Sequence, residues 1–408
     1  MYIHNFRVRN YMIHKDTSIR LQPLSVLVGP NGGGKSALFD AMLNFSMLSR
    51  GNIQQAFGPY PYSYISTIYR GSNNLTRIGF EITMSETQAS DISYSYEIDY
   101  AQTDNSLRAT FLIFQEKLTR KPDNKVLFDR GDGVNEITQF LQLENDRSLF
   151  SALRLYSSSN HSSLDSSLVY LTQQISRFNK FRLDPSTLSA PSRLPDLNNE
   201  QPTIPPRIGY LGEDLAATLY FLVETQHPSY SAICDKIREL VPEFDGFIFN
   251  TVGTDRVAFS IQYTDQRESV PSVRLSSGML IYIGLIVLVL TPNRPPVLMI
   301  EEPENGLTPQ ALKVFYQAVR SLAFNENPEQ RSQVLLSSHS PFVICEAWNG
   351  EDRDFIYQVK VKKGQALVRK FSTLIDEQEI HLAKDNDGQR TSLSLKNAEE
   401  IMSGYLSI

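Results

Sequence analysis

Hydrophobic and polar residues follow two different periods along this chain, and the changes between them mark the predicted elements. Alternation predicts a strand at residues 6–8, and the mainly apolar run at 24–28 predicts a buried strand. After Gly34, apolar residues recur with helical spacing as far as Leu48. Short alternating stretches within 77–118 predict an antiparallel meander with one solvated face. The chain therefore begins with strands, and one of them leads through a glycine-rich turn into a helix.

The second half of the chain shows longer apolar segments. Two loops are predicted, one by the serine-rich residues 157–167 and one by the six prolines of 185–206. Helical spacing at 213–224 and 230–240 predicts a mainly helical region after these loops. The apolar run 279–290 is too short for a bilayer, which needs about 20 residues, and predicts a buried helix. Apolar runs at 297–300 and 334–336 predict two further buried strands.

Composition narrows the class of protein. Lysine and arginine total 39 against 45 acidic residues among 408, so the net charge of −6 gives no chain-wide basic surface for nucleic acid. The two cysteines, Cys234 and Cys345, exclude a disulfide framework, and Cys234 lies in a helical apolar pattern typical of a buried thiol. With no charged-then-apolar leader, we expect a globular cytoplasmic protein.

The strongest chemical signal is the segment GPNGGGKS at residues 29–36, which matches GxxxxGK[ST] between a predicted strand and a predicted helix. Glycines let backbone N–H groups converge on phosphate oxygens, and the helix directs its positive end at the same anion. Lys35 is expected to reach the β- and γ-phosphates, and the Ser36 hydroxyl is expected to bind Mg²⁺. The predicted nucleotide-binding residues here are Gly29, Pro30, Asn31, Gly32, Gly33, Gly34, Lys35, Ser36 and Ala37.

Two acids end the predicted strand at 297–300. Ligands gather at the carboxyl ends of such strands, and neighbouring strand residues point to opposite sides. Glu301 is therefore assigned to Mg²⁺ and Glu302 to the attacking water, with a solvated acidic turn as the alternative. His339 follows the strand at 334–336 and is a candidate sensor of the γ-phosphate, although a lone histidine is more often a structural hydrogen bonder.

The segment LSSG at 275–278 opens the apolar helix. A helix start of this kind can hold an anion, and Ser276 and Gly278 are candidates for nucleotide contact, but for this segment alone a simple N-cap by Ser276 is favoured. From the residues alone we assign Lys35 to the phosphates and Glu302 to the attacking water, and His339 stays open between a structural and a catalytic role.

The order Lys35, Ser276, Glu302, His339 resembles the ABC-type ATPase heads of the RecF, SMC and OLD group. Four further segments are similar to stand-alone RecF-like AAA ATPases of bacteria, namely FRVRNY at 6–11, LDPS at 183–186, LGEDL at 211–215 and EEPENGL at 301–307. The chain departs from that pattern at Met12, where relatives carry lysine, and at Thr308, where they carry histidine. No glutamine matches the Q-loop well, and Gln54 and Gln55 are the candidates.

The resemblance implies an α/β P-loop NTPase fold of the ABC-type head, with a mixed sheet, an antiparallel β subdomain and an inserted mainly helical subdomain. The expected domains are 1–150, 151–245 and 246–408. The resemblance also implies ATP and Mg²⁺ as ligands, catalytic roles for Lys35, Glu302 and His339, and a homodimer in which Ser276 and Gly278 close on the partner's ATP. We further expect an effector, nuclease or toxin partner in antiphage defence and contact with DNA or RNA. We expect no contact with a membrane.

Two basic stretches need their own interpretation. RFNKFR at 177–182 interleaves three cations with two aromatic residues, as in nucleic-acid interfaces, but core aromatics with snorkelling cations are favoured. VKVKK at 359–363 fits an edge strand protected by lysines. The six histidines are dispersed and form no metal-binding spacing.

Three function classes remain open for an ATP-binding head. The leading one is an ATPase that controls a nucleic-acid-directed or effector-directed process, with DNA repair or maintenance as a related alternative. The second is a scaffold or sensor that turns ATP over slowly while it holds an effector. A transporter motor is disfavoured because more than 200 residues separate Ser36 from Leu275.

Overall fold

A computed structural model describes residues 1–57, 66–69, 72, 76–103, 110–131, 134–135, 143–157, 165–195, 206–264, 268–350, 352–376, 393 and 398. The chain folds into two compact units. The first unit comprises residues 1–178, 354–381 and 402–408, and the second comprises 179–353 and 382–401.

The first unit contains an antiparallel sheet in the order β2-β1-β4-β5-β6-β7-β8. Its strands are β1 Tyr2–Tyr11, β2 His14–Arg20, β4 Ile78–Ser85, β5 Ser93–Gln102, β6 Phe111–Lys121, β7 Lys125–Asp129 and β8 Val134–Asn135. Buried and partly exposed residues alternate along β5, as the one-sided pattern of its sequence requires. The predicted meander is therefore confirmed for β4, β5 and β6.

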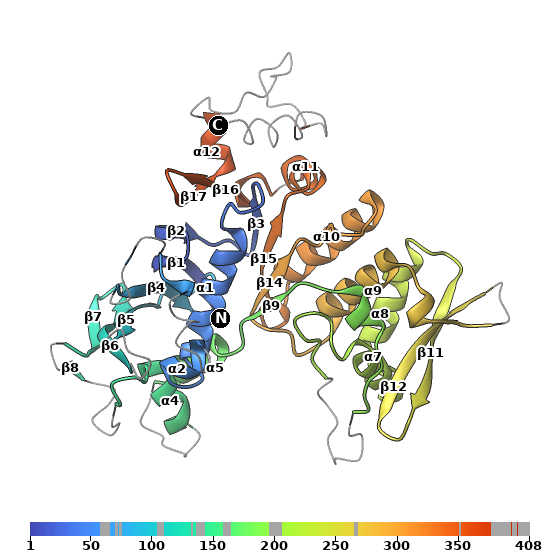
Figure 1. Ribbon diagram of the computed structural model, residues 1–408, viewed down its shortest axis with the longest axis horizontal. Coiled ribbons are helices and arrows are strands. Elements are labelled where there is room, and N and C mark those ends of the chain that lie inside the picture. The colour runs from blue at the N-terminus through green and yellow to red at the C-terminus, as the bar shows by residue number, and fades with distance from the viewer. Residues whose placement is uncertain are drawn as a thin grey trace. The chain divides into compact units, whose positions relative to one another are not determined.

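Helix α1 (Lys35–Leu48) covers the apolar face of this sheet (Figure 1). The ring of Phe45 on α1 lies 6.1 Å from Phe6, 5.9 Å from Phe80 and 6.0 Å from Tyr96, measured between ring centroids. Aromatic pairs at such separations add to the free energy of burial. The helix that follows the glycine-rich turn is thus fixed by rings from three strands.

Three further strands of the first unit lie in the order β17-β16-β3. They are β3 Leu24–Val28, β16 Ile356–Lys362 and β17 Gln365–Lys370. β16 is parallel to β3 through Gln358 and antiparallel to β17 along its length. The prediction of an edge strand at 359–363 is wrong, because β16 lies between two strands and β17 takes the outer position.

The remaining helices of the first unit are α2 Ile53–Phe57, α4 Leu149–Ser157, α5 Ser166–Ile175 and α12 Phe371–Asp376, and the turn η3 Arg353–Phe355 precedes β16. The fully buried Glu116 fixes the start of α4, because its Oε1 accepts from the Leu149 backbone N–H at 2.6 Å. Arg130 Nη2 lies 2.6 Å from the other oxygen of Glu116 and compensates its charge. Most of the predicted loop at 157–167 lies outside the described residues.

The second unit is built on the parallel strands β9 Asn179–Phe181, β14 Val297–Glu301 and β15 Gln333–Ser338. Their helices are α9 Ser277–Leu290, α10 Pro309–Ala323 and α11 Pro341–Asn349, with the 3-10 turns η1 Ser272–Arg274 and η2 Pro328–Gln330. α9 is buried from Leu280 to Val289, so the prediction of a buried helix at 279–290 is confirmed. Among the described residues, no helix combines the length and hydropathy needed to cross a bilayer.

Shorter elements complete the second unit. They are α6 Pro185–Ser189, α7 Leu215–Glu224, α8 Ser229–Arg238 and the strands β10 Ser192–Arg193, β11 Phe244–Val252, β12 Arg256–Tyr263 and β13 Val270–Pro271. Helices α7 and α8 confirm the helical patterns at 213–224 and 230–240. The sheet β10-β12-β11 projects beside them (Figure 1).

The predicted loop at 185–206 is wrong in its first part. Pro185 occupies the first turn of α6, where its missing N–H costs nothing, and Asp184 caps that helix by accepting from Thr187 N at 3.0 Å. Residues 196–205 lie outside the described part. Five helices begin within or next to 151–245 in the described chain, and the division into 1–150, 151–245 and 246–408 stays a prediction.

Candidate functional site

The phosphate loop, residues 29–36, connects β3 to α1 in the first unit. Gly32 and Gly34 have φ angles of 76° and 107°, a region that favours glycine. A Cβ at Gly29 would lie 2.0 Å from the Val359 carbonyl oxygen, and one at Gly33 would lie 2.8 Å from it. The loop therefore needs glycine both for its backbone angles and for its packing against β16.

Lys35 lies inside the loop and is 5% exposed. Its Nζ donates to the carbonyl oxygens of Gly29 at 2.7 Å and Pro30 at 3.0 Å, so the ammonium is held over the start of the loop. Ser36 is exposed at the first turn of α1. A buried ammonium, a helix start and an exposed hydroxyl fit a nucleotide phosphate, because phosphate oxygens form stronger charge-assisted bonds than neutral carbonyls.

The carboxyl ends of β14 and β15 form a second candidate site, which we call the acid edge; it comprises Glu301, Glu302, Glu304 and His339. Glu301 pairs in register with Ser337 and is 5% exposed. Its Oε2 lies 3.5 Å from Lys180 Nζ and 3.4 Å from the hydroxyl of Tyr210. Its Oε1 is buried and has no hydrogen-bond partner among the described residues.

Glu302 adopts a backbone conformation that is unusual outside glycine, with a φ of 47°. Its N–H donates to the Ser337 carbonyl at 2.9 Å, and Asn305 Nδ2 donates to its Oε2 at 3.1 Å. Arg182 Nη2 lies 3.2 Å from the same carboxylate oxygen. Several contacts thus hold Glu302 in this conformation, as is common for residues of functional sites.

Glu304 connects this turn to the histidine loop. Its Oε1 accepts from the Ser338 hydroxyl and from the His339 backbone N–H, each at 2.8 Å. The His339 Nδ1 lies 3.2 Å from Glu304 Oε1 and 3.9 Å from Glu302 Oε1. The imidazole and the predicted catalytic carboxylate are therefore neighbours.

Buried polar atoms without hydrogen bonds concentrate at the acid edge. In the described chain these include Glu301 Oε1, Glu304 Oε2, Ser337 Oγ and His339 Nδ1. Native proteins leave few such atoms, and each calls for an explanation such as an ion or a substrate. The unpartnered oxygen of Glu301 fits a Mg²⁺ ligand. Among the described residues, no group of three His, Cys, Asp or Glu side chains is placed to hold a metal ion.

Ser276 and Gly278 lie at the start of α9. The exposed Ser276 is the N-cap, and its Oγ accepts from the Met279 N–H at 3.2 Å. A Cβ at Gly278 would lie 2.4 Å from the carbonyl oxygen of Gly306, in the turn that follows the acid edge. The N-cap interpretation of Ser276 is thus confirmed, and its contact with nucleotide stays a prediction.

Comparison with known proteins identifies the family. Residues 24–345 match the profile described as "AAA domain, putative AbiEii toxin, Type IV TA system". The chain belongs to this family of AAA ATPases. The matched range contains the phosphate loop, the start of α9 and the whole acid edge.

Two relatives show how far the likeness extends. Over 157 residues, 37% of this chain, the ATPase is 28% identical to "DNA double-strand break repair Rad50 ATPase" of Methanococcus maripaludis, of which it covers 13%. The solved structure "Crystal structure of the SmcHead bound to the C-winged helix domain of ScpA" aligns with 91% of this chain and 99% of its own, with a TM-score of 0.54 and 11% identity. The fold is that of an SMC head-like ABC ATPase, as predicted.

The predicted site residues of this AAA ATPase fall into two sets. Lys35 and Ser36 lie in the first unit, whereas Glu301, Glu302 and His339 meet in the second. The sequence assigned no role at the acid edge to Glu304 or to the residues that support this edge, which are Lys180, Arg182, Tyr210 and Asn305.

The segment 177–182 stands out by its composition, but it serves another purpose. Phe178 and Phe181 are 0% and 2% exposed, so base stacking on these rings is ruled out and the core interpretation is confirmed. β9 runs parallel to β14 with Lys180 opposite Met299, which places Lys180 and Arg182 beside the two acids. Pairing between segments about 120 residues apart leaves no local signal.

Other candidates have local structural roles. Gln55 forms a reciprocal cap with Asn52 at the start of α2, where Asn52 Oδ1 accepts from Gln55 N at 2.9 Å. Thr308 caps α10 by accepting from Ala311 N at 3.2 Å. Cys234 is buried, as predicted. The Q-loop assignment stays a prediction.

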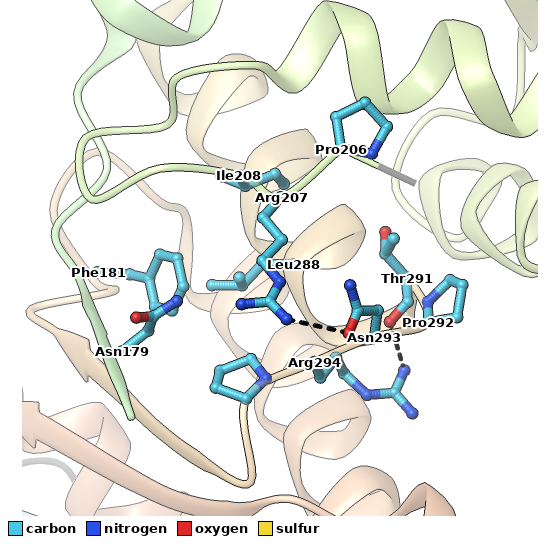
Figure 2. Close-up of a pocket in the computed structure, with 11 residues that line it drawn as sticks. Asn179, Phe181, Pro206, Arg207, Ile208, Leu288, Thr291, Pro292, Asn293 and Arg294 are labelled. Atoms are coloured by element: carbon cyan, nitrogen blue, oxygen red, sulfur yellow. Dashed lines mark hydrogen bonds between the residues drawn. The ribbon is translucent and has the colours of Figure 1, made fainter. Parts of the chain in front are cut away.

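A small pocket, partly open to solvent, lies at the amino ends of β9 and β14 (Figure 2). Arg207 Nη2 donates to Asn293 Oδ1 at 3.2 Å across this pocket. Arg294 donates to the carbonyl oxygens of Val289 and Thr291, each at 2.9 Å, and so caps the end of α9. The pocket is at the opposite end of these strands from Glu301 and is distinct from the acid edge.

Proposed function

We propose that this AAA ATPase binds and hydrolyses ATP, and that two copies close around the nucleotide to control a process directed at nucleic acid or at an effector protein. The acid edge carries the proposal of hydrolysis. The backbone φ of Glu302 is 47°, its carboxylate lies beside an imidazole, and buried polar atoms around it lack partners among the described residues. This arrangement suits catalysis better than a purely structural role.

We assign separate roles to the residues of the phosphate loop and of the acid edge. The loop amides and Lys35 bind the phosphates, while Ser36 and Glu301 would hold Mg²⁺. When bound, Mg²⁺ neutralises charge on the β- and γ-phosphates. Glu302 orients the attacking water and accepts its proton, and His339 contacts the transferred phosphoryl group.

Closure of two copies would complete each site. Ser276 is exposed at a helix start, where backbone N–H groups and the helix dipole favour an anion. Val273, three residues earlier, is 69% exposed, and such an apolar side chain suits a surface that becomes covered. A two-fold interface would repeat this contact at both nucleotides.

The process under control is proposed from relatives. The description of the matched family names the AbiEii toxin and a type IV TA system, and the similar SMC head was solved with a ScpA domain bound to it. Both support a protein partner, and we propose a nuclease or toxin partner in bacterial antiphage defence. The Rad50 likeness supports the alternative of DNA repair or maintenance.

Turnover of the purified protein tests hydrolysis. Phosphate release with ATP and Mg²⁺ is expected to exceed that of Lys35→Ala, the background control. Release equal to that background, with or without duplex DNA, would contradict hydrolysis and favour the slow scaffold. Stimulation by DNA would favour a nucleic-acid-directed process over an effector-directed one.

A further inference from the structure

Two segments outside the family-matched residues 24–345 form a floor beneath the phosphate loop. They are the start of β2, at His14, and the hairpin of β16 and β17. The hairpin is joined to the β2 turn by a hydrogen bond from the Ala366 N–H to the Ile13 carbonyl at 2.8 Å. The family match therefore leaves this floor without an assigned role.

The loop rests on this floor without spare room. A Cβ at Gly34 would lie 2.9 Å from Ile13 Cδ1, 3.1 Å from Ala366 Cβ and 3.2 Å from His14 Nε2. The Val359 carbonyl supports the loop from the same hairpin, as described for Gly29. A change in the floor would therefore reach the loop directly.

His14 is the polar member of the floor. It is fully buried, and its Nε2 lies 3.0 Å from the Gly34 carbonyl oxygen, while its Nδ1 lies 2.9 Å from Thr17 Oγ1. A carbonyl oxygen can only accept, so Nε2 carries the hydrogen and, in the neutral ring, Nδ1 accepts. The Thr17 hydroxyl therefore donates to Nδ1 at 2.9 Å rather than to its other acceptor, the Ala366 carbonyl oxygen, at the longer distance of 3.4 Å. Burial lowers the pKa of His14, which keeps the ring neutral at pH 7.

The orientation of one peptide group follows from this bond. In a trans peptide the C=O and the N–H point in opposite directions. The Gly34 carbonyl accepts from His14 and from the Leu38 N–H at 3.0 Å, so the Lys35 N–H of the same peptide points back into the loop. That N–H is one of the donors available to a phosphate.

We propose that His14 is a positioning residue for nucleotide binding, which fixes the Gly34–Lys35 peptide so that its N–H faces the phosphate. The inference rests on the proposed nucleotide site. It assigns to a buried histidine outside the family-matched residues a part in ATP affinity, although His14 itself does not touch the nucleotide.

Two amide substitutions separate the two ring nitrogens. His14→Gln places a donor near the Nε2 position and should bind ATP as the parent does. His14→Asn reaches only toward Thr17 and should bind roughly fivefold more weakly, the effect of one lost neutral hydrogen bond. His4→Asn is the matched control. His4 lies on β1, and its Nε2 forms a hydrogen bond with Ser85 Oγ at 2.7 Å, so this variant should leave the ATP affinity unchanged.

Affinity is measured by titration with ATP, well below the unfolding temperature of each variant. Equal affinities of His14→Asn and parent would overturn the inference, while loss in Lys35→Ala would still uphold the nucleotide site. Equal affinities of parent and Lys35→Ala would overturn the nucleotide site itself. In ¹⁵N spectra of the parent, a protonated Nε2 and an unprotonated Nδ1 are expected for His14, and the reverse tautomer would also overturn the inference.

Discussion

The phosphate loop and the acid edge hold charged groups in opposite ways. The loop is one continuous segment whose backbone supplies the donors, and its single ammonium, Lys35, is bonded within the loop. The acid edge joins β9, β14, β15 and the turn after β14, and it leaves buried oxygens of Glu301 and Glu304 without partners among the described residues. In the first arrangement the Lys35 ammonium already has hydrogen-bond partners, and the backbone N–H groups remain for a phosphate, whereas in the second the buried carboxylate oxygens themselves remain for a ligand.

This difference predicts different responses to mutation. Changes in the loop should alter the affinity for nucleotide, because we propose that the loop binds the phosphates. Changes in the acid edge, or at the start of α9 beside the turn that follows this edge, should alter dimer closure and ATP turnover. The affinity for ATP should be largely kept.

The largest effect on ATP affinity is expected for Lys35→Ala. The phosphates lose their buried cation while the loop amides remain, so ATP affinity should fall about 100-fold, the upper range for a hydrogen bond to a charged group. ATP titration measures this fall. Lys117→Ala removes another lysine of the same unit, paired with Asp129 at 2.9 Å, and should leave the affinity unchanged. Unchanged affinity in Lys35→Ala would remove the assignment of the loop.

Ser276→Arg should abolish ATP-induced dimerisation. An arginine at this exposed helix start would fill the place proposed for the partner's nucleotide, while the phosphate loop of the same chain is untouched. Light scattering with and without ATP measures dimerisation, and titration checks that each chain still binds ATP. Dimerisation equal to that of the parent would contradict the two-fold closure.

Gly278→Ala should reduce turnover about tenfold and keep ATP affinity. The added Cβ would lie 2.4 Å from the Gly306 carbonyl oxygen, so the turn that follows Glu302 must move, and misplaced catalytic groups lose rate. Gly246→Ala is the control, because its Cβ would meet only Tyr230 Oη at an ordinary 3.4 Å. Equal turnover of the two variants would show that the contact between Gly278 and Gly306 does not support catalysis.

The smallest effect concerns Glu304. Glu304→Gln keeps an acceptor for Ser338 and His339 and should change turnover by less than about threefold. Glu304→Ala loses both hydrogen bonds and should lower the free energy of unfolding by about 1–3 kcal/mol. Chemical denaturation and phosphate release measure these two quantities. If phosphate release fell further in Glu304→Gln than in Glu304→Ala, the charge of Glu304 would matter more for turnover than its hydrogen bonds.

The sequence predicted the phosphate loop and both acids because these signals are local. A strand, a glycine turn and a helix follow one another within 24–48, and Glu301 and Glu302 directly end an apolar run. The partners of those acids come from other segments: Lys180 reaches Glu301 through the parallel pairing of β9 with β14. Pairing of distant strands depends on the complete fold, so the sequence predicted the buried aromatic residues of 177–182 but not the contacts of Lys180 and Arg182 with the two acids.

The same reason explains the error at 359–363. Alternating valine and lysine describes a strand with one solvated side, and an edge strand is the usual case. β16 keeps that pattern because its pairing with β3 ends at Gln358, where the phosphate loop crosses it, and β17 takes the outer position. His14 was likewise only one of six dispersed histidines until the fold placed it beneath Gly34.

The central claim is that binding and hydrolysis reside in separate parts of the chain, and Glu302→Gln tests it most directly. The substitution keeps the shape of Glu302 and removes its charge, so ATP affinity measured by titration should stay within about threefold of the parent, while phosphate release should fall about 100-fold or more. An ATP-bound dimer should accumulate. Phosphate release at the parental rate would contradict the claim and make Glu301 the better candidate for the catalytic carboxylate.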